Sequence, residues 1–182
     1  SKEIFHEGLF LPIMRFAVGG EFDPNVVAII EANVRDKVQV MGDIHSLAAC
    51  NDVGAARLLA MMDEYALDDL DDLGDHILGA SRTAMLNAVA ELPRGTWTST
   101  MRVDGIDEPI DIVATLTVSD DGIDVDFTGT GAQVPHGINV PMAYTDAYTS
   151  FGVRCIVGPD VPNNTGSLEV VRVSAPAGCI LN

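Results

Sequence analysis

The sequence predicts an α+β fold in which an N-terminal helical segment precedes an antiparallel β meander with a further helix and strand. Two observations lead to this prediction. Apolar residues recur every three or four positions through residues 23–92, and they alternate with polar residues after the break Pro93-Arg94-Gly95. Because the helical pattern comes before the strand pattern, the helices are expected to lie on one side of the sheet.

Residues 23–92 are expected to form three helices. The first is short and begins after the N-cap Asp23, with Pro24 at the first helical position. The second carries one apolar stripe between Val38 and Met62, although two glycines weaken a continuous helix there. The third spans residues 68–91.

An acidic run leads into this third helix. Seven Asp and Glu side chains occur between positions 63 and 75. The run lacks the glycine and the glutamate that an EF-hand calcium loop needs at fixed positions. We therefore interpret the run as a solvated helix face.

The C-terminal part, residues 96–182, is predicted to be mainly β with one helix. Residues 96–103 and 110–118 read as strands, and a tight turn at 119–122 leads into a third strand at 123–127. Glycine, proline and asparagine mark 129–141 as an irregular loop. A helix at 142–157 and a last strand at 168–174 complete the pattern.

Composition narrows the classes of partner. The 182 residues include 27 acidic and 10 basic side chains, for a net charge of -17, and 47% of them are hydrophobic. This hydrophobic content excludes an intrinsically disordered acidic chain. Because a strongly negative surface repels phosphate backbones and anionic lipid, we expect neither a nucleic-acid nor a membrane partner. Small molecules, cations or basic protein surfaces fit better.

The cytoplasm is the expected location. The sequence contains neither an apolar run of roughly 18 residues nor a signal segment. Its three cysteines, Cys50, Cys155 and Cys179, lack the pairing and spacing of a disulfide framework or a zinc site, and we expect reduced, buried thiols.

Few side chains in the sequence have the spacing of a nucleotide-binding, acid–base or cation-binding site. Neither lysine lies in a nucleotide-binding glycine loop. His45 lies near Asp43 on the second helix, where the pair is either a general acid or base or simply an exposed part of the helix surface. Asp126 shares one strand face with Asp124, an arrangement that suits either a shared cation or plain solvation.

The glycine-rich loop after the third strand is the least ordinary segment. A strand that runs into glycines with Thr and Asn side chains, here Thr128 and Asn139, brings backbone close to a ligand or to another segment. The alternative is a loop whose polar side chains hydrogen-bond to neighbouring backbone groups. The sequence leaves both interpretations open.

A set of short motifs, taken in order along the chain, resembles the hydantoinase B/oxoprolinase family. They are Glu7-Gly8-Leu9, Ala32-Asn33-Val34-Arg35, Gly42-Asp43, Leu92-Pro93-Arg94-Gly95-Thr96, Val125-Asp126-Phe127-Thr128-Gly129-Thr130, Ile138-Asn139-Val140-Pro141, Val161-Pro162-Asn163-Asn164-Thr165-Gly166 and Pro176-Ala177-Gly178-Cys179-Ile180-Leu181-Asn182. Members of this family are longer, so the resemblance implies that residues 1–182 are a central fragment of a hydantoinase B-type subunit, inactive alone.

The resemblance also implies an activity. Family members carry out ATP-dependent opening of cyclic amides such as 5-oxoproline and N-methylhydantoin, or carboxylation of ketones such as acetone and acetophenone. A hydantoinase A-type subunit or domain binds ATP with Mg and phosphorylates the substrate, and the B-type part then supplies a metal-bound water or a general base. A non-catalytic assembly domain of the complex is a further alternative.

Site residues follow from the same motifs. Glu7, Thr128, Asn139 and Asn163 are expected to bind substrate, and Asp43, His45 and Asp126 are the candidates for catalysis. The alternative for Asn163 is a turn residue before a strand. The divalent metal of the family is expected on segments before Ser1, so this chain is expected to contribute no metal ligand.

Overall fold

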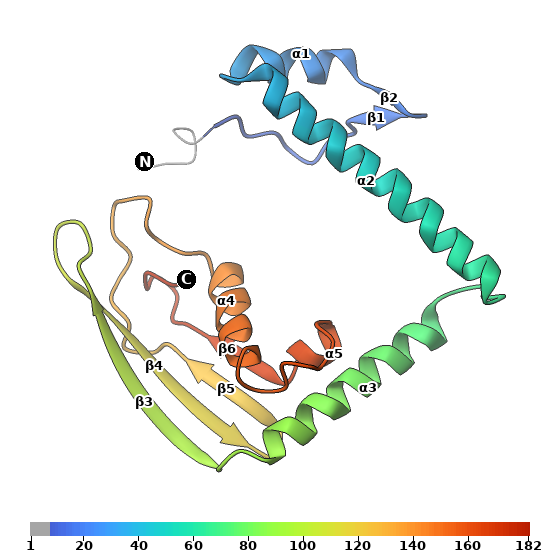
Figure 1. The fold of residues 1–182 in the computed structure, drawn as a ribbon. Coiled ribbons are helices and arrows are strands. Elements are labelled where there is room, and N and C mark those ends of the chain that lie inside the picture. The colour runs from blue at the N-terminus through green and yellow to red at the C-terminus, as the bar shows by residue number, and fades with distance from the viewer. Residues whose placement is uncertain (1–7) are drawn as a thin grey trace. The chain divides into compact units, whose positions relative to one another are not determined.

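The computed structural model describes residues 8–182. The chain divides into two compact units, Ser1–Asp69 and Leu70–Asn182 (Figure 1). The order of elements confirms the predicted α+β fold, with helices first and most strands later. The second unit contains the sheet and the larger core.

The first unit begins with a hairpin that the helical pattern did not predict. Strands β1 (Ala17–Val18) and β2 (Glu21–Phe22) pair antiparallel around Gly19 and Gly20. Both glycines have positive φ, 60° and 86°, as a two-residue hairpin turn of this hand requires. The Gly-Gly pair is therefore the signal that predicts this turn.

Two helices complete the first unit. In α1 (Pro24–Asn33), the Asp23 carboxylate accepts hydrogen bonds from the backbone N–H groups of Asn25 at 2.8 Å and Val26 at 3.4 Å, so the predicted N-cap is confirmed. Helix α2 (Lys37–Glu64) is continuous despite its two glycines. A small core of Val26, Ile30 and Met41 joins the two helices.

Most of the apolar stripe on α2 is not buried. Val38 and Leu59 of this stripe are 85% and 65% exposed. The reason is the size of the first unit, because α1 contacts only part of a helix of 28 residues. The stripe is therefore an uncovered apolar surface.

The sequence predicts that the acidic run forms one helix face, but in the structure the run is divided between two helices and a turn. It begins at the end of α2, crosses a turn in which Ala66 has a φ of 52°, and ends in the first turns of α3 (Asp71–Ala90). Its seven acidic residues are all exposed, so the expected solvation is confirmed.

The second unit is built on a four-stranded sheet with the order β3-β4-β5-β6. Strands β3 (Gly95–Val103), β4 (Ile110–Ser119) and β5 (Gly122–Asp126) form the predicted antiparallel meander. The last strand, β6 (Val171–Ser174), pairs parallel to β5. A parallel neighbour requires a crossover connection, and α4 (Met142–Arg154) and α5 (Thr165–Leu168) lie within it.

The two faces of this sheet differ in chemistry. Leu116, Val125 and Val173 lie side by side in register on the face that the helices cover (Figure 1). The main core forms there, around Met85 and Val89 of α3. The opposite face is polar and carries Thr pairs and Arg–Asp ion pairs. This alternation is what the period of two in the sequence predicted.

Helix α5 packs closely against α3. A Cβ atom on Gly166 would lie 2.1 Å from the backbone oxygen of Leu78, so only glycine fits at this contact. The side-chain amide of Asn164, which caps α5, donates to the hydroxyl of the buried Ser81 at 2.8 Å. Ser167 is fully buried and donates to the carbonyl of Pro162 at 2.8 Å.

We predict that Gly166→Ala lowers the free energy of unfolding of the second unit by about 2 kcal/mol or more, because the new methyl group collides with backbone. Urea titration followed by fluorescence checks this, since the single tryptophan, Trp97, lies in that unit.

The matched control is Gly152→Ala on α4, where no atom lies within 4 Å of the added carbon. This variant should be neutral or more stable by up to about 1 kcal/mol, as expected for alanine in a helix. Equal stability of the two variants would show that the α3–α5 contact is not tight.

Candidate functional site

A groove of about 780 Å³ lies in the second unit, between α4, α5 and the start of β6. Its apolar wall comes from Ala143, Ala147 and Phe151 of α4, with Leu168 and Val171 opposite. Polar side chains are interspersed with this wall: Asp146, Ser150, Arg154, Cys155, Asn163, Thr165 and Glu169. An apolar groove with a few convergent polar groups is the usual form of a small-molecule site.

Arg154 is the cation of this groove. Its half-buried guanidinium donates to the backbone oxygen of Val161, and it approaches the thioether sulfur of Met85 at 3.7 Å. These contacts hold the side chain in place and engage only part of its five N–H groups. Within residues 8–182 it has no carboxylate partner.

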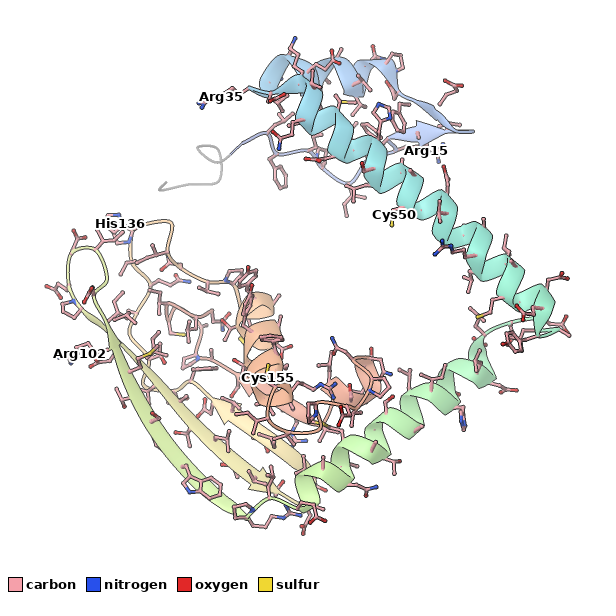
Figure 2. The ribbon with its side chains drawn as sticks, in the orientation of Figure 1. Arg15, Arg35, Cys50, Arg102, His136 and Cys155 are labelled. Atoms are coloured by element: carbon pink, nitrogen blue, oxygen red, sulfur yellow. The ribbon has the colours of Figure 1, made fainter. Side chains whose placement is uncertain are left out.

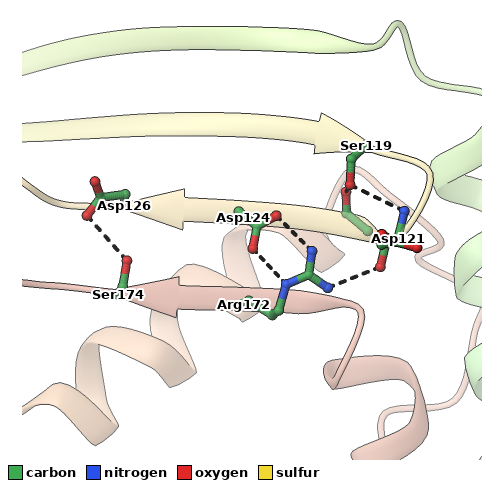
Figure 3. A network of polar contacts seen from close by, with 7 residues as sticks. Ser119, Asp121, Asp124, Asp126, Arg172 and Ser174 are labelled. Carbon is green, nitrogen blue, oxygen red and sulfur yellow. Dashed lines mark hydrogen bonds and ion pairs between the residues drawn. The ribbon is translucent and has the colours of Figure 1, made fainter.

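Three other arginines of the second unit behave differently. Arg94, Arg102 and Arg172 each form an ion pair with an aspartate, at distances of 2.9, 2.6 and 2.6 Å. Figure 3 shows Arg172 held between Asp124 and the backbone oxygen of Asp121. Arg154 differs from these three arginines in that no carboxylate pairs with its guanidinium in the described part of the chain.

Three polar side chains of the groove are also largely uncommitted. Asn163 and Glu169 make no side-chain hydrogen bond within the described part of the chain. Asp146 accepts one, from the buried hydroxyl of Ser150 at 3.3 Å. The groove therefore offers a cation, an amide and two carboxylates to a ligand.

The cysteines carry free thiols, as expected, but their predicted burial is only partly right. Cys179 is buried, whereas Cys50 and Cys155 are exposed. Cys155 follows the last residue of α4 and lines the groove (Figure 2).

The carboxylate of Asp126 is occupied by its own loop. It accepts hydrogen bonds from the hydroxyl and the backbone N–H of Thr128, at 2.9 and 3.0 Å, and from the Ser174 hydroxyl at 3.3 Å (Figure 3). The hydrogen bonds from Thr128, with a smaller contribution from Ser174, hold the pKa of Asp126 below its ordinary value. Asp126 and Thr128 thus form the turn that leaves β5.

Asn139 also bonds within its own loop. Its side-chain oxygen accepts from the N–H of Val134 at 2.9 Å, and its amide donates to the carbonyls of Val134 and His136, at 2.7 and 3.1 Å. His136 in turn lies 2.8 Å from a carboxylate oxygen of Asp107. These contacts favour the backbone-satisfying interpretation of the glycine-rich loop.

The remaining predicted residues are not part of the groove. Asp43 and His45 are exposed on α2 in the first unit, where the His45 ring stacks on Phe22 at a centroid distance of 4.7 Å. Glu7 lies outside the described residues. Asn163 is thus the one predicted residue in the groove, and Arg154 was missed. A hint was available, because Asp146 and Arg154 are the only charges in the predicted helix at 142–157.

No group of three or more His, Cys, Asp or Glu side chains in residues 8–182 is placed to hold a metal ion. None of the helices in this part of the chain combines the length and hydropathy needed to cross a membrane.

Comparison with known proteins gives a consistent set of relatives. The family model for hydantoinase B/oxoprolinase matches residues 1–182. The chain is 26% identical to an uncharacterized protein of Methanocaldococcus jannaschii, covering 100% of this chain and 32% of that protein. It is also 26% identical to a 5-oxoprolinase of Pestalotiopsis fici, covering 100% of this chain and 15% of the enzyme.

A solved structure shows the same fold. The ATP-dependent caprolactamase of Pseudomonas jessenii matches with a TM-score of 0.83 at 24% identity, covering 100% of this chain and 32% of the caprolactamase chain. This chain thus spans a third or less of the length of these relatives.

We predict that acid destabilises the chain partly through Asp126. Because the folded state lowers the pKa of this carboxyl below 3.8, its contribution is present above about pH 4 and is lost as the pH falls through the lower folded value. Asp126→Asn should therefore reduce stability at pH 7 and flatten the acid decline, with melting temperatures measured from pH 2 to 7.

Asp160→Asn serves as the control, since Asp160 is exposed and its carboxylate makes no hydrogen bond within the described part of the chain. If both variants show the acid profile of the original chain, the hydrogen bonds from Thr128 do not favour the charged form.

Proposed function

The chain belongs to the hydantoinase B/oxoprolinase family, as its ordered motifs had indicated, and we propose that it is the central part of a subunit of an ATP-dependent cyclic-amide hydrolase. The match of the family model to every residue of the chain carries this proposal. The names of two relatives support it, because one is a 5-oxoprolinase and the other an ATP-dependent caprolactamase. Both names denote the opening of a cyclic amide.

The chemistry explains why two components are needed. An amide carbonyl is a poor electrophile, and ATP, bound with Mg on a hydantoinase A-type partner, would supply the phosphoryl group that activates its oxygen. We propose that any further divalent metal is bound by segments outside this chain. We expect the chain to be inactive without its partner.

The chain itself would bind and orient the ring. The apolar wall formed by Phe151 and Leu168 suits contact with ring methylenes. The uncommitted amide of Asn163 can hydrogen-bond to a polar atom of the ring. Asp126, Thr128 and Asn139 would act indirectly, by fixing the loop after β5, and Glu7 keeps its proposed role in substrate binding.

Asp43 and His45 remain the proposed proton acceptors. Both are exposed, and neither makes a side-chain hydrogen bond within residues 8–182. Either an imidazole or a carboxylate can remove a proton from an attacking water. The stacking of His45 on Phe22 fixes the position of its ring.

An assembly role is the second candidate, and the bare stripe on α2 favours it. Val38 and Leu59 of this stripe are 85% and 65% exposed. Such a surface is typical of a contact with another polypeptide. The free thiols fit a reducing compartment, and we propose that the complex is cytoplasmic.

We predict that Asp43→Asn and His45→Gln each lower turnover of the assembled enzyme by about 10²-fold or more, as the loss of a general base does. The measurement is phosphate release and ring opening with 5-oxoproline, caprolactam and hydantoin, using the B-type subunit that contains this chain together with its A-type partner.

Asp52→Asn on the same helix is the control and should retain full turnover. Unchanged turnover in the first two variants, with weaker binding of the partner, would favour the assembly role. Release of phosphate only with a ketone and bicarbonate would identify a carboxylase instead.

A further inference from the structure

The groove between α4 and α5 has a charge pattern that matches one class of ligand. Arg154 and Glu169 both line it, yet they form no ion pair with each other. Two opposite charges that share a groove without pairing leave room for a ligand that carries the reverse pattern. Such a ligand has a carboxylate at one end and an ammonium group at the other.

We propose that this groove binds the free amino acid that a lactam releases when its ring opens, an inference that rests on the proposed function. Hydrolysis breaks the ring C–N bond, adds OH to the carbon and H to the nitrogen, and leaves one carboxyl and one amine in the same molecule. Near neutral pH both groups are charged, so every product of this class is a zwitterion.

Each end of the ligand has a named partner. The guanidinium of Arg154 is fixed by Val161 and Met85 and keeps N–H groups free for a carboxylate. The carboxylate of Glu169 accepts no hydrogen bond within the described residues and would hold the ammonium group. Asn163 donates a further hydrogen bond, and Phe151 with Leu168 contacts the methylenes between the two ends.

The size and chemistry of the groove narrow the substrate class. A volume of about 780 Å³ admits an amino acid with a chain of several methylenes. A hydantoin would instead release an N-carbamoyl amino acid, whose uncharged ureido end gains little from Glu169. The groove therefore favours lactams over hydantoins as substrates of the complex.

The test measures binding of 6-aminohexanoate to the 182-residue chain by calorimetry, without ATP or partner, so that it can succeed or fail independently of ring opening. We expect 6-aminohexanoate to bind at least about tenfold more tightly than hexanoate, hexylamine or N-carbamoyl-6-aminohexanoate, since each lacks one charge. Equal affinity for these four compounds would overturn the proposal.

Variants distinguish the two ends. Glu169→Gln should weaken 6-aminohexanoate by about tenfold and leave hexanoate unchanged, whereas Arg154→Gln should weaken both. Arg82→Gln, an exposed arginine of α3 outside the groove, is the control and should bind normally. If circular dichroism shows that Arg154→Gln is unfolded, the test rests on Glu169→Gln and Asn163→Ala. Normal binding of 6-aminohexanoate by both of these variants would reject the site.

Discussion

The contact between α3 and α5 is the constraint on which the second unit depends. Gly166 brings the backbone of α5 against the carbonyl of Leu78, and Asn164 reaches the buried hydroxyl of Ser81. A turn of only four helical residues gains little stability from its own hydrogen bonds, so this packing must hold it. Once α5 is fixed, the chain re-enters the sheet beside β5 in the parallel direction.

The same contact builds the groove. One wall is α4, which packs on β6, and the other is the segment from Asn163 to Glu169 that α3 holds in place. The loop between them is tied to α4 by the bond from Arg154 to the carbonyl of Val161. The guanidinium of Arg154 thus both holds this loop by a hydrogen bond and places a positive charge in the groove.

Several elements could be predicted from local sequence because their causes are local. Asp23 and Pro24 specify the start of α1, and the alternation after Gly95 specifies the meander. The Gly19-Gly20 hairpin has an equally local signal, the glycine pair itself, although the hairpin was not predicted. The predicted apolar stripe on α2 is buried only at Met41, because an apolar period indicates which helix face can pack and does not supply a partner for it.

The site was harder to predict, because its residues come together only through tertiary structure. The motifs predict Asp126, Thr128 and Asn139 as site residues, whereas the structure gives each of them hydrogen bonds to its own loop. Arg154 was not predicted, because the sequence of α4 does not show that its guanidinium lacks an ion pair with an aspartate. Asn163 was selected for its motif, and only the folding of α5 shows that it lines a groove.

We propose one activity for the complex that includes this chain, the ATP-dependent opening of a cyclic amide. The most direct measurement counts phosphate released and rings opened in the same reaction, with purified partner and B-type subunit and a lactam substrate. We predict one phosphate for each ring opened and neither product when a subunit or ATP is omitted. Ring opening that proceeds without ATP, or phosphate release that opens no ring, would contradict the account.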